Sequence, residues 1–248
     1  MIDKSDIKAI FFDLYGTLLI CEDLASAWTH WFSTFFDNLK NRGLNLSKSE
    51  FKIKCDNFFG KQEPMIQKKK FTVFEHRIIS LCNDIGLTLE EKDIKEIALA
   101  CLDAWQEHMT LDPEAIIVLK TLKQQYALAL ISNFDHPPHV YSLLANLNLR
   151  NFFDSIVISA DVGVKKPDPS IFSFALKEIG LHPNNCIYIG DENIDSIAAK
   201  TAGIHSITIK REQINQNQGN SFYKSNFKTK NESSIIIFNL STLIKMLM

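Results

Sequence analysis

The stretch AIFFDLYGTL, residues 9–18, constrains the fold more than any other part of the chain. Four apolar residues of the kind found in buried strands run directly into Asp13, and a Gly16-Thr17 turn follows at once. Open α/β sheets bind their ligands beyond the carboxyl ends of their strands. The pattern therefore predicts one carboxylate at the ligand-binding edge of a sheet.

Short apolar segments alternate with helical patterns from residue 112 onward, which predicts a parallel sheet covered by helices on both faces. The expected strands lie at 9–13, 127–131, 156–158, 187–189, 207–209 and 235–238. Asp112-Pro113 is expected to be the N-cap and first residue of a helix. A stretch rich in Asn, Gln, Ser and Lys, residues 211–233, predicts a mobile loop, and a helix should end the chain.

Residues 22–110 have a different, helical texture. Aromatic side chains recur with helical spacing at Trp28, Trp31, Phe32, Phe35 and Phe36, and we expect them in a core rather than around a substrate. Ser47 and Glu50 fit a capping box that opens a second helix. The sequence thus predicts an α/β core from residues 1–20 and 111–248, with a helical domain, residues 21–110, inserted after the first strand.

Composition excludes several classes of protein. The formal net charge of −2 favours neither nucleic acid nor a membrane surface as a partner. No stretch reaches the roughly 18 apolar residues of a membrane span, and the polar first residues do not resemble a signal peptide. The five cysteines are scattered without a C-x-x-C pair, which is typical of a reducing, cytoplasmic compartment.

Three further segments carry polar residues and strengthen the case for a site around Asp13. They are Ser132-Asn133 after an apolar strand, Lys166 before Pro167, and Asp191 with Asp195 after the strand at 187–189. Each has an ordinary structural explanation: a turn signal, a surface lysine, or carboxylates at a helix N-terminus. His136 and His139 lie three residues apart, but a helix start led by Pro137 is a better explanation than a zinc site.

Taken in order with Asp13, these segments resemble motifs I to IV of the haloacid dehalogenase-like superfamily, subfamily I with a helical C1-type cap. The resemblance implies a Rossmann-like α/β fold of three layers in which Asp13 is the nucleophile and Lys166 assists it. It implies that Tyr15, Ser132, Asn133 and Lys166 bind the substrate's phosphate. It also implies a Mg²⁺ ion held by Asp13, the backbone carbonyl of Tyr15, Asp191 and Asp195, while Thr17 orders the turn.

Tyr15 departs from the family's phosphatases, which have a second Asp at this position as general acid and base. A phenol has an ordinary pKa of about 10 and is a poor base near neutrality. Losing a general acid/base typically costs about 10²–10⁴ in rate, unless another group such as Glu192 substitutes. L-2-haloacid dehalogenases share Asp-x-Tyr-Gly-Thr, Ser-Asn and Lys-Pro, and they use no metal.

The fourth motif distinguishes the two activities. Dehalogenases have Ser-Ser-Asn-x-x-Asp there, whereas this chain has Gly190-Asp191-Glu192 and then Asp195. Without a metal, the carboxylates would crowd one another, weaken Asp13 as a nucleophile and repel a haloacid. We therefore expect a Mg²⁺-dependent phosphatase, monomeric or homodimeric, that acts on a small phosphorylated metabolite through an aspartyl-phosphate. A dehalogenase and a non-catalytic, regulatory protein remain the alternatives.

Overall fold

The computed structural model describes residues 4–63, 70–211 and 235–248. These residues form two compact units. One contains residues 4–20, 110–211 and 235–248, and the other contains residues 21–63 and 70–109. The loop expected at 211–233 lies outside the described residues, apart from Arg211.

The larger unit is built on a six-stranded parallel sheet with the order β5-β4-β1-β6-β7-β8. The strands are β1 (Ala9–Phe12), β4 (Ala127–Ser132), β5 (Ser155–Ile158), β6 (Cys186–Gly190), β7 (His205–Ile209) and β8 (Ile235–Ile237). Strand β1 lies between β4 and β6, and Phe12 pairs with Leu130 on one side and Ile189 on the other. This register brings the segments that follow these three strands to one edge.

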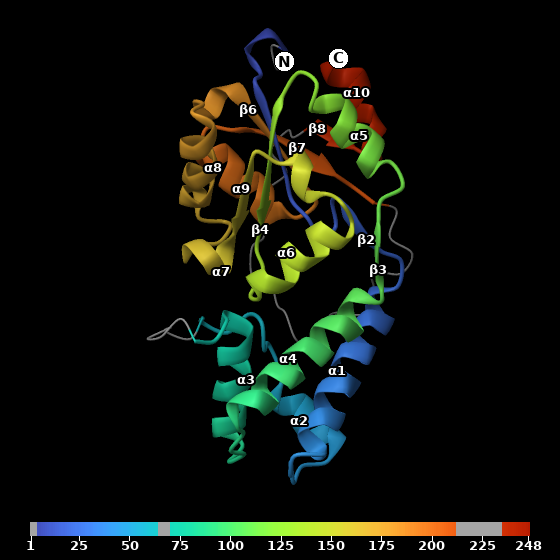
Figure 1. Ribbon diagram of the computed structural model, residues 1–248, viewed down its shortest axis with the longest axis vertical. Helices are drawn as coiled ribbons and strands as arrows, with labels where there is room; N and C mark the ends of the chain where they lie inside the picture. The colour runs from blue at the N-terminus through green and yellow to red at the C-terminus, as the bar shows by residue number, and fades with distance from the viewer. Residues whose placement is uncertain (1–3, 64–69, 212–234) are drawn as a thin grey trace. The chain divides into compact units, whose positions relative to one another are not determined.

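Helices cover both faces of the sheet, as the alternation of strands and helices predicts (Figure 1). On one face α5 (Ala115–Leu122), α6 (Pro137–Asn146) and α10 (Ser241–Leu247) pack against Ile10 and Phe12 of β1. On the other face α8 (Phe172–Ile179) and α9 (Asn193–Thr201) pack against Ala9 and Phe11. The short helix α7 (Ser159–Val162) follows β5, and 3-10 turns lie at Lys4–Asp6, Arg150–Phe152, Pro169–Ile171 and Pro183–Asn185. The α/β, Rossmann-like fold class is confirmed.

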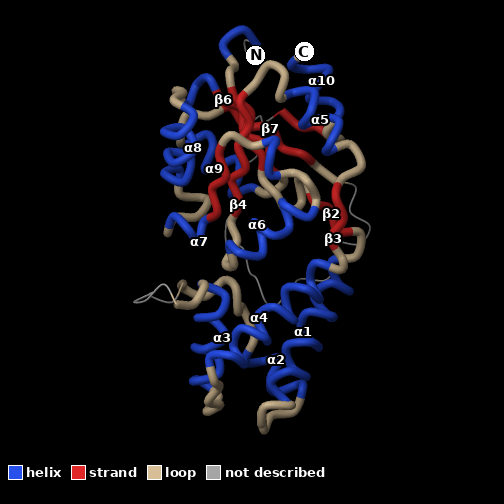
Figure 2. Tube along the Cα trace, in the orientation of Figure 1, coloured by secondary structure: helices blue, strands red, loops and turns tan. Residues whose placement is uncertain are grey.

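The described residues of the smaller unit form the helices α1 (Leu24–Lys40), α2 (Lys48–Lys54), α3 (Val73–Asp84) and α4 (Glu91–Gln106), drawn in blue in Figure 2. The predicted capping box of Ser47 and Glu50 is present at the start of α2. Trp31, Phe32 and Phe35 are buried, and Trp28 and Phe36 are half-buried. The aromatic face of α1 therefore forms the core of this unit, as expected.

Residues 19–21 and 109–111 form a pair of strands, β2 (Leu19–Cys21) and β3 (Met109–Leu111), which were not predicted because they are too short to show an alternating pattern. One predicted boundary was wrong. Helix α5 begins at Ala115 rather than Pro113. The reason is that the Asp112 carboxylate accepts the backbone N–H of Glu114 at 2.7 Å, which closes a turn before the helix.

Candidate active site

Asp13 follows β1 directly and lies at the carboxyl edge of the sheet. Its backbone N–H donates to the Ile189 carbonyl at 2.9 Å, which extends the β1–β6 ladder by one residue. Its side chain is buried, and Oδ1 lies 2.7 Å from Nζ of Lys166. Ser132, the last residue of β4, is also buried at this edge. The structure thus brings Asp13, Lys166 and the end of β4 together, although they are far apart in the sequence.

Three carboxylates converge at this edge. Asp13, Asp191 and Asp195 each offer an oxygen, and these oxygens lie within 4.8 Å of one another. The Asp195 carboxylate accepts the backbone N–H of Glu192 at 3.0 Å and lies 2.7 Å from Nζ of Lys166. In contrast, Oδ1 of Asp191 is buried and has no hydrogen-bond partner within the described part of the chain. Asp191 therefore points an unpaired oxygen into the cluster.

The carboxylates carry more negative charge than Lys166 neutralises. Burial raises the pKa of Asp13 to about 7, although Lys166 opposes the shift. Burial, followed by repulsion from Asp13 and Asp195, raises the pKa of Asp191 well above its ordinary value. A divalent cation relieves such repulsion, and hard cations such as Mg²⁺ take carboxylate oxygens as ligands. The residues present therefore fit a magnesium site.

Asn133 holds the backbone of Lys166 on both sides. Its Nδ2 donates to the Lys166 carbonyl at 3.0 Å, and its Oδ1 accepts the Lys166 N–H at 2.9 Å. This double contact fixes the loop that carries the ammonium. Asn133 was predicted to bind phosphate, and its second amide hydrogen is the group that could still do so. The structure assigns it first to positioning Lys166.

Tyr15 lies in a stack of rings close to Asp13. Its ring is 5.1 Å from that of Phe134, with an interplanar angle of 12°, and Phe134 is in turn stacked on His139. Burial, and then the charge of Asp13, raises the pKa of the Tyr15 phenol. The phenol therefore stays protonated near neutral pH and can donate a hydrogen bond without acting as a base.

Glu192 is already engaged at the start of α9. Its backbone N–H donates to the Asp195 carboxylate at 3.0 Å, and its backbone carbonyl accepts the Asp195 N–H at 3.2 Å. Burial, followed by repulsion from Asp195, raises the pKa of the Glu192 carboxyl group. Glu192 is therefore fixed through its backbone at the N-terminus of α9, next to the cluster of carboxylates.

Comparison with known proteins identifies the family of the chain region that contains Asp13, Lys166, Asp191 and Asp195. The sequence model of the haloacid dehalogenase-like hydrolases matches residues 7–203. The chain belongs to this family. Members of the family are hydrolases, and this protein is an enzyme of that class. The predicted resemblance is thereby confirmed for the family as a whole.

Individual relatives of this haloacid dehalogenase-like hydrolase include both phosphatases and a dehalogenase. It is 26% identical over 200 residues to N-acylneuraminate-9-phosphatase of Rattus norvegicus, covering 75% of each chain. It is 27% identical over 205 residues to glyceraldehyde 3-phosphate phosphatase of Pyrococcus furiosus, covering 82% of this chain and 81% of the relative. It is 24% identical over 210 residues to (S)-2-haloacid dehalogenase of Pseudomonas fluorescens, covering 84% and 86%.

Solved structures show the same fold at low sequence identity. The HAD phosphatase from Thermococcus onnurineus has a TM-score of 0.66 and is 20% identical, with 97% of this chain and 98% of that chain covered. The HAD-hydrolase YfnB from Bacillus subtilis, whose structure contains magnesium, has a TM-score of 0.62 and is 19% identical, with the same coverage. Within the described residues, none of the helices is long and apolar enough to cross a membrane.

The prediction overlooked two residues of this hydrolase that contact the site. Arg211 donates to the Thr17 carbonyl at 2.5 Å and pairs with Asp112 at 2.6 Å. It therefore links the segment after β7 to the Gly16-Thr17 turn that follows Asp13. Thr17 itself is fully buried, and its predicted role in ordering the turn stays a prediction. Tyr188, in the middle of β6, accepts a hydrogen bond from the Lys166 ammonium at 2.7 Å, and its hydroxyl lies 3.2 Å from Oδ1 of Asp195, to which it can donate. Tyr188 could have been noticed in the sequence, because it is the one residue with a polar hydroxyl in the otherwise apolar strand segment 186–190.

His136 and His139 lie where a helix start was predicted. His136 is the N-cap of α6, Pro137 is its first residue, and Nδ1 of His136 accepts the His139 N–H at 3.2 Å. Burial, and then His136, lowers the pKa of His139 to about 4. Both side chains therefore serve the local structure, as the sequence predicts.

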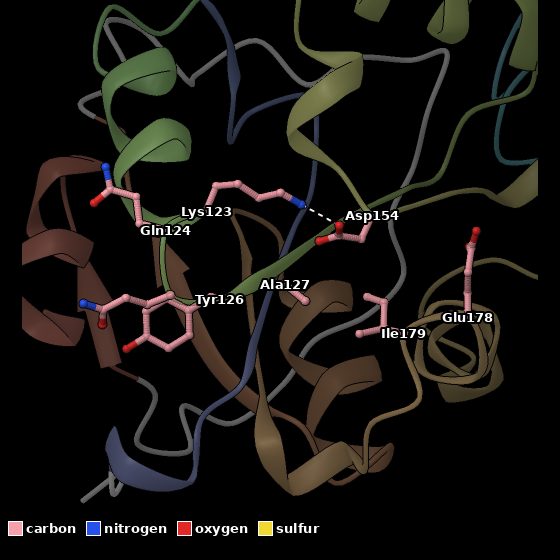
Figure 3. A pocket seen from close by; sticks show the side chains of 8 residues that line it. Lys123, Gln124, Tyr126, Ala127, Asp154, Glu178 and Ile179 are labelled. Atoms are coloured by element: carbon pink, nitrogen blue, oxygen red, sulfur yellow. Dashed lines mark ion pairs between the residues drawn. The ribbon is translucent and has the colours of Figure 1, made fainter.

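An open hollow lies at the opposite edge of the sheet, where Ala127 begins β4 (Figure 3). Lys123 and Asp154 form an ion pair of 2.5 Å across it, shown by the dashed line. Tyr126 also lines the hollow, and its hydroxyl donates to the Leu247 carbonyl at 2.7 Å. These residues are remote from Asp13 along the strands and provide controls for tests of the site.

The tight approach of Gly16 to Asp191 gives a first test. A Cβ on Gly16, whose φ is +81°, would lie 2.2 Å from Oδ2 of Asp191, whereas a Cβ on Gly163, at φ +72°, would meet nothing within 4 Å. Both Gly→Ala variants should lose about 1–2 kcal/mol from left-handed backbone strain. Only Gly16→Ala should also lose the rise in melting temperature that bound Mg²⁺ would give, because the added Cβ would displace the carboxylate of Asp191, a candidate metal ligand. Equal Mg²⁺ responses in the two variants would contradict this.

Proposed function

We propose that this hydrolase is a Mg²⁺-dependent phosphatase that cleaves a small phosphorylated metabolite through an aspartyl-phosphate on Asp13. The observation that carries the proposal is the cluster of Asp13, Asp191 and Asp195, in which one buried oxygen of Asp191 has no hydrogen-bond partner among the described residues. Such a cluster suits a cation, which would lower the raised pKa of Asp13 and keep it ionised. An ionised carboxylate is the nucleophile that the reaction requires.

The proposed metal ligands are Asp13, Asp191, Asp195 and the backbone carbonyl of Tyr15. A bound Mg²⁺ supplies positive charge beside the transferring phosphoryl group. Lys166 supplies a second positive charge from a fixed position, since its ammonium lies 2.7 Å from both Asp13 and Asp195. Preorganised charge of this kind stabilises the transition state without reorganisation during the reaction.

The proposed reaction has two displacements at phosphorus. First, an Asp13 oxygen bonds to phosphorus, the bond to the leaving oxygen breaks, and that oxygen takes a proton from solvent water. Then a second water attacks the same phosphorus and gives a proton back to solvent, the bond to Asp13 breaks, and inorganic phosphate leaves. Ser132 and Lys166 bind the phosphoryl oxygens, and Tyr15 can donate a hydrogen bond to them. Asn133 acts chiefly through the backbone of Lys166.

The comparisons support this proposal at the level of substrate class. Two of the relatives described above are named for phosphatase activity on small phosphorylated compounds. We further propose that residues 21–110 act as a helical cap on a core of residues 1–20 and 111–248. We also propose a monomer or homodimer in the cytoplasm, where the chain's free thiols would remain reduced.

Haloacid dehalogenation is the second candidate, and Tyr15 is the observation that favours it. The relative from Pseudomonas fluorescens is named (S)-2-haloacid dehalogenase. In such a reaction Asp13 would displace halide at carbon, so a proton donor for the leaving group would be unnecessary. The negative charge around Asp13 would repel the substrate's carboxylate, which is why we rank this candidate second.

One assay separates the two candidates. Acetyl phosphate and an activated aryl phosphate are incubated with the enzyme in Mg²⁺ or in EDTA, and L-2-chloropropionate is incubated in parallel with detection of halide. We expect phosphate release in Mg²⁺ that falls by about 10²-fold or more in EDTA, because the metal provides several kcal/mol of charge stabilisation. Halide release that EDTA leaves unchanged would replace the phosphatase by the dehalogenase.

A further inference from the structure

Tyr188 is a fully buried tyrosine whose hydroxyl lies at the active-site ammonium. It occupies the middle of β6, and its neighbours along that strand are apolar. Its hydroxyl oxygen lies 2.7 Å from Nζ of Lys166, 3.1 Å from the Ile131 carbonyl and 3.2 Å from Oδ1 of Asp195. A buried phenol needs a partner for its hydroxyl, and this one has three within reach.

The hydrogens of the Lys166 ammonium determine whether the Tyr188 hydroxyl donates or accepts. The Lys166 ammonium has three hydrogens, and its three contacts at 2.7 Å are to Asp13, Asp195 and the Tyr188 hydroxyl. The Ile131 carbonyl, at 3.3 Å, is a weaker fourth acceptor. Tyr188 therefore accepts one hydrogen from Lys166 and donates its own to Ile131 or Asp195. All three ammonium hydrogens are then directed to fixed acceptors.

We propose that Tyr188 is a positioning residue, which holds the Lys166 ammonium between the nucleophile Asp13 and the helix residue Asp195. Burial opposes a charged lysine, while Asp13 and Asp195 raise its pKa above the ordinary value. The two carboxylates thus keep the charge, and the hydroxyl fixes where the third hydrogen points. Without it, the ammonium can turn toward the Ile131 carbonyl or one carboxylate and lose its bridging position.

The hydroxyl can be removed with little change in packing. The Tyr188 ring packs edge-on against Phe172, with centroids 5.0 Å apart, and this contact would survive in Tyr188→Phe. Tyr126 provides a matched control, because it is buried, its hydroxyl donates a 2.7 Å bond to the Leu247 carbonyl, and it lies at the opposite edge of the sheet. Tyr126→Phe also removes one buried hydroxyl but leaves Lys166 untouched.

The test combines crystal structures of both variants with kinetics on acetyl phosphate in Mg²⁺. We expect both variants to show a similar fall in melting temperature. Only Tyr188→Phe should move Nζ of Lys166 out of hydrogen-bond distance of Asp13 or Asp195. Only this variant should lose about tenfold in kcat, because a charged hydrogen bond that orders the reacting groups is missing. KM should change less, because Ser132 still binds the phosphate.

The outcomes separate this inference from the proposed function, on which its kinetic part rests. If Nζ keeps both carboxylate contacts in Tyr188→Phe and kcat equals that of Tyr126→Phe, Tyr188 is not a positioning residue. If Nζ moves while the wild-type enzyme releases no phosphate, the positioning role stands and the phosphatase proposal fails. An equal loss of kcat in both variants would mean that lost stability, rather than the ammonium, governs the rate, and would overturn the inference.

Discussion

Asp13→Asn is expected to reduce turnover by about 10³-fold or more, because an amide cannot form the covalent intermediate that the reaction requires. The side chain keeps its size, and β1 and its register depend on the backbone, so the fold should persist. The variant should also lose the attraction between Asp13 and Lys166, which are 2.7 Å apart. Phosphate release from acetyl phosphate, measured beside the melting temperature, separates the loss of chemistry from a loss of folding.

Asp154→Asn is the matched control for this prediction. Asp154 pairs with Lys123 at 2.5 Å and accepts the Leu128 N–H at 2.9 Å, at the edge of the sheet away from Asp13. This variant should change stability and retain wild-type kcat. A covalent phosphoenzyme that forms in wild type and not in Asp13→Asn would identify the nucleophile directly. Wild-type turnover by Asp13→Asn would reject Asp13 as the nucleophile.

Tyr15→Asp is expected to raise kcat on unactivated alkyl phosphates by about 10²-fold, within the usual 10²–10⁴ contribution of a general acid/base. The substitution places a carboxyl group two residues after Asp13, in the position that the family's phosphatases use. The gain should be smaller for acetyl phosphate in the first displacement, since its leaving group needs no proton. Initial rates on both substrates in Mg²⁺ measure the difference.

Two companion variants isolate the carboxyl group. Tyr15→Asn has the same size as Tyr15→Asp but cannot transfer a proton in the same way, so it should gain nothing. Tyr15→Phe keeps the stack with Phe134 and removes only the hydroxyl. Its kcat should remain near wild type, because a phenol with a raised pKa is a poor base, and the loss of a hydrogen bond to the phosphate should appear as a higher KM. A complete loss of activity in Tyr15→Phe would show instead that the hydroxyl takes part in the chemistry.

The sequence predicts the parallel core because its strands are apolar segments with clear ends. The strand expected at 187–189 corresponds to β6, and the one at 127–131 to β4, each within one residue at either end. Polar residues at strand ends then meet at one edge, since parallel strands place their carboxyl ends together. This geometry explains why Asp13 and Ser132, at the ends of β1 and β4, lie at one edge, whereas Lys166 follows no strand and was named from its resemblance to the family's Lys-Pro motif.

The remaining features depend on contacts between distant residues, which no local pattern records. The pairing of β2 with β3 joins segments about 90 residues apart, each three residues long. Family resemblance predicted that Asn133 binds phosphate. In the structure its side chain forms two hydrogen bonds with the backbone of Lys166. Arg211 was placed in a loop for its composition, yet its guanidinium reaches Thr17 and Asp112.

The pairing of β2 and β3 also bears on how such an enzyme can diversify. The chain leaves the α/β unit at β2 and re-enters it at β3, and these two strands are hydrogen-bonded neighbours. The two ends of the segment between β2 and β3 are therefore close together. Under this condition a whole domain can be inserted or exchanged without disturbing the host fold. Its length and composition can change without altering the order of the six-stranded sheet. Evolution can in this way vary the helical unit while the residues around Asp13 stay in register.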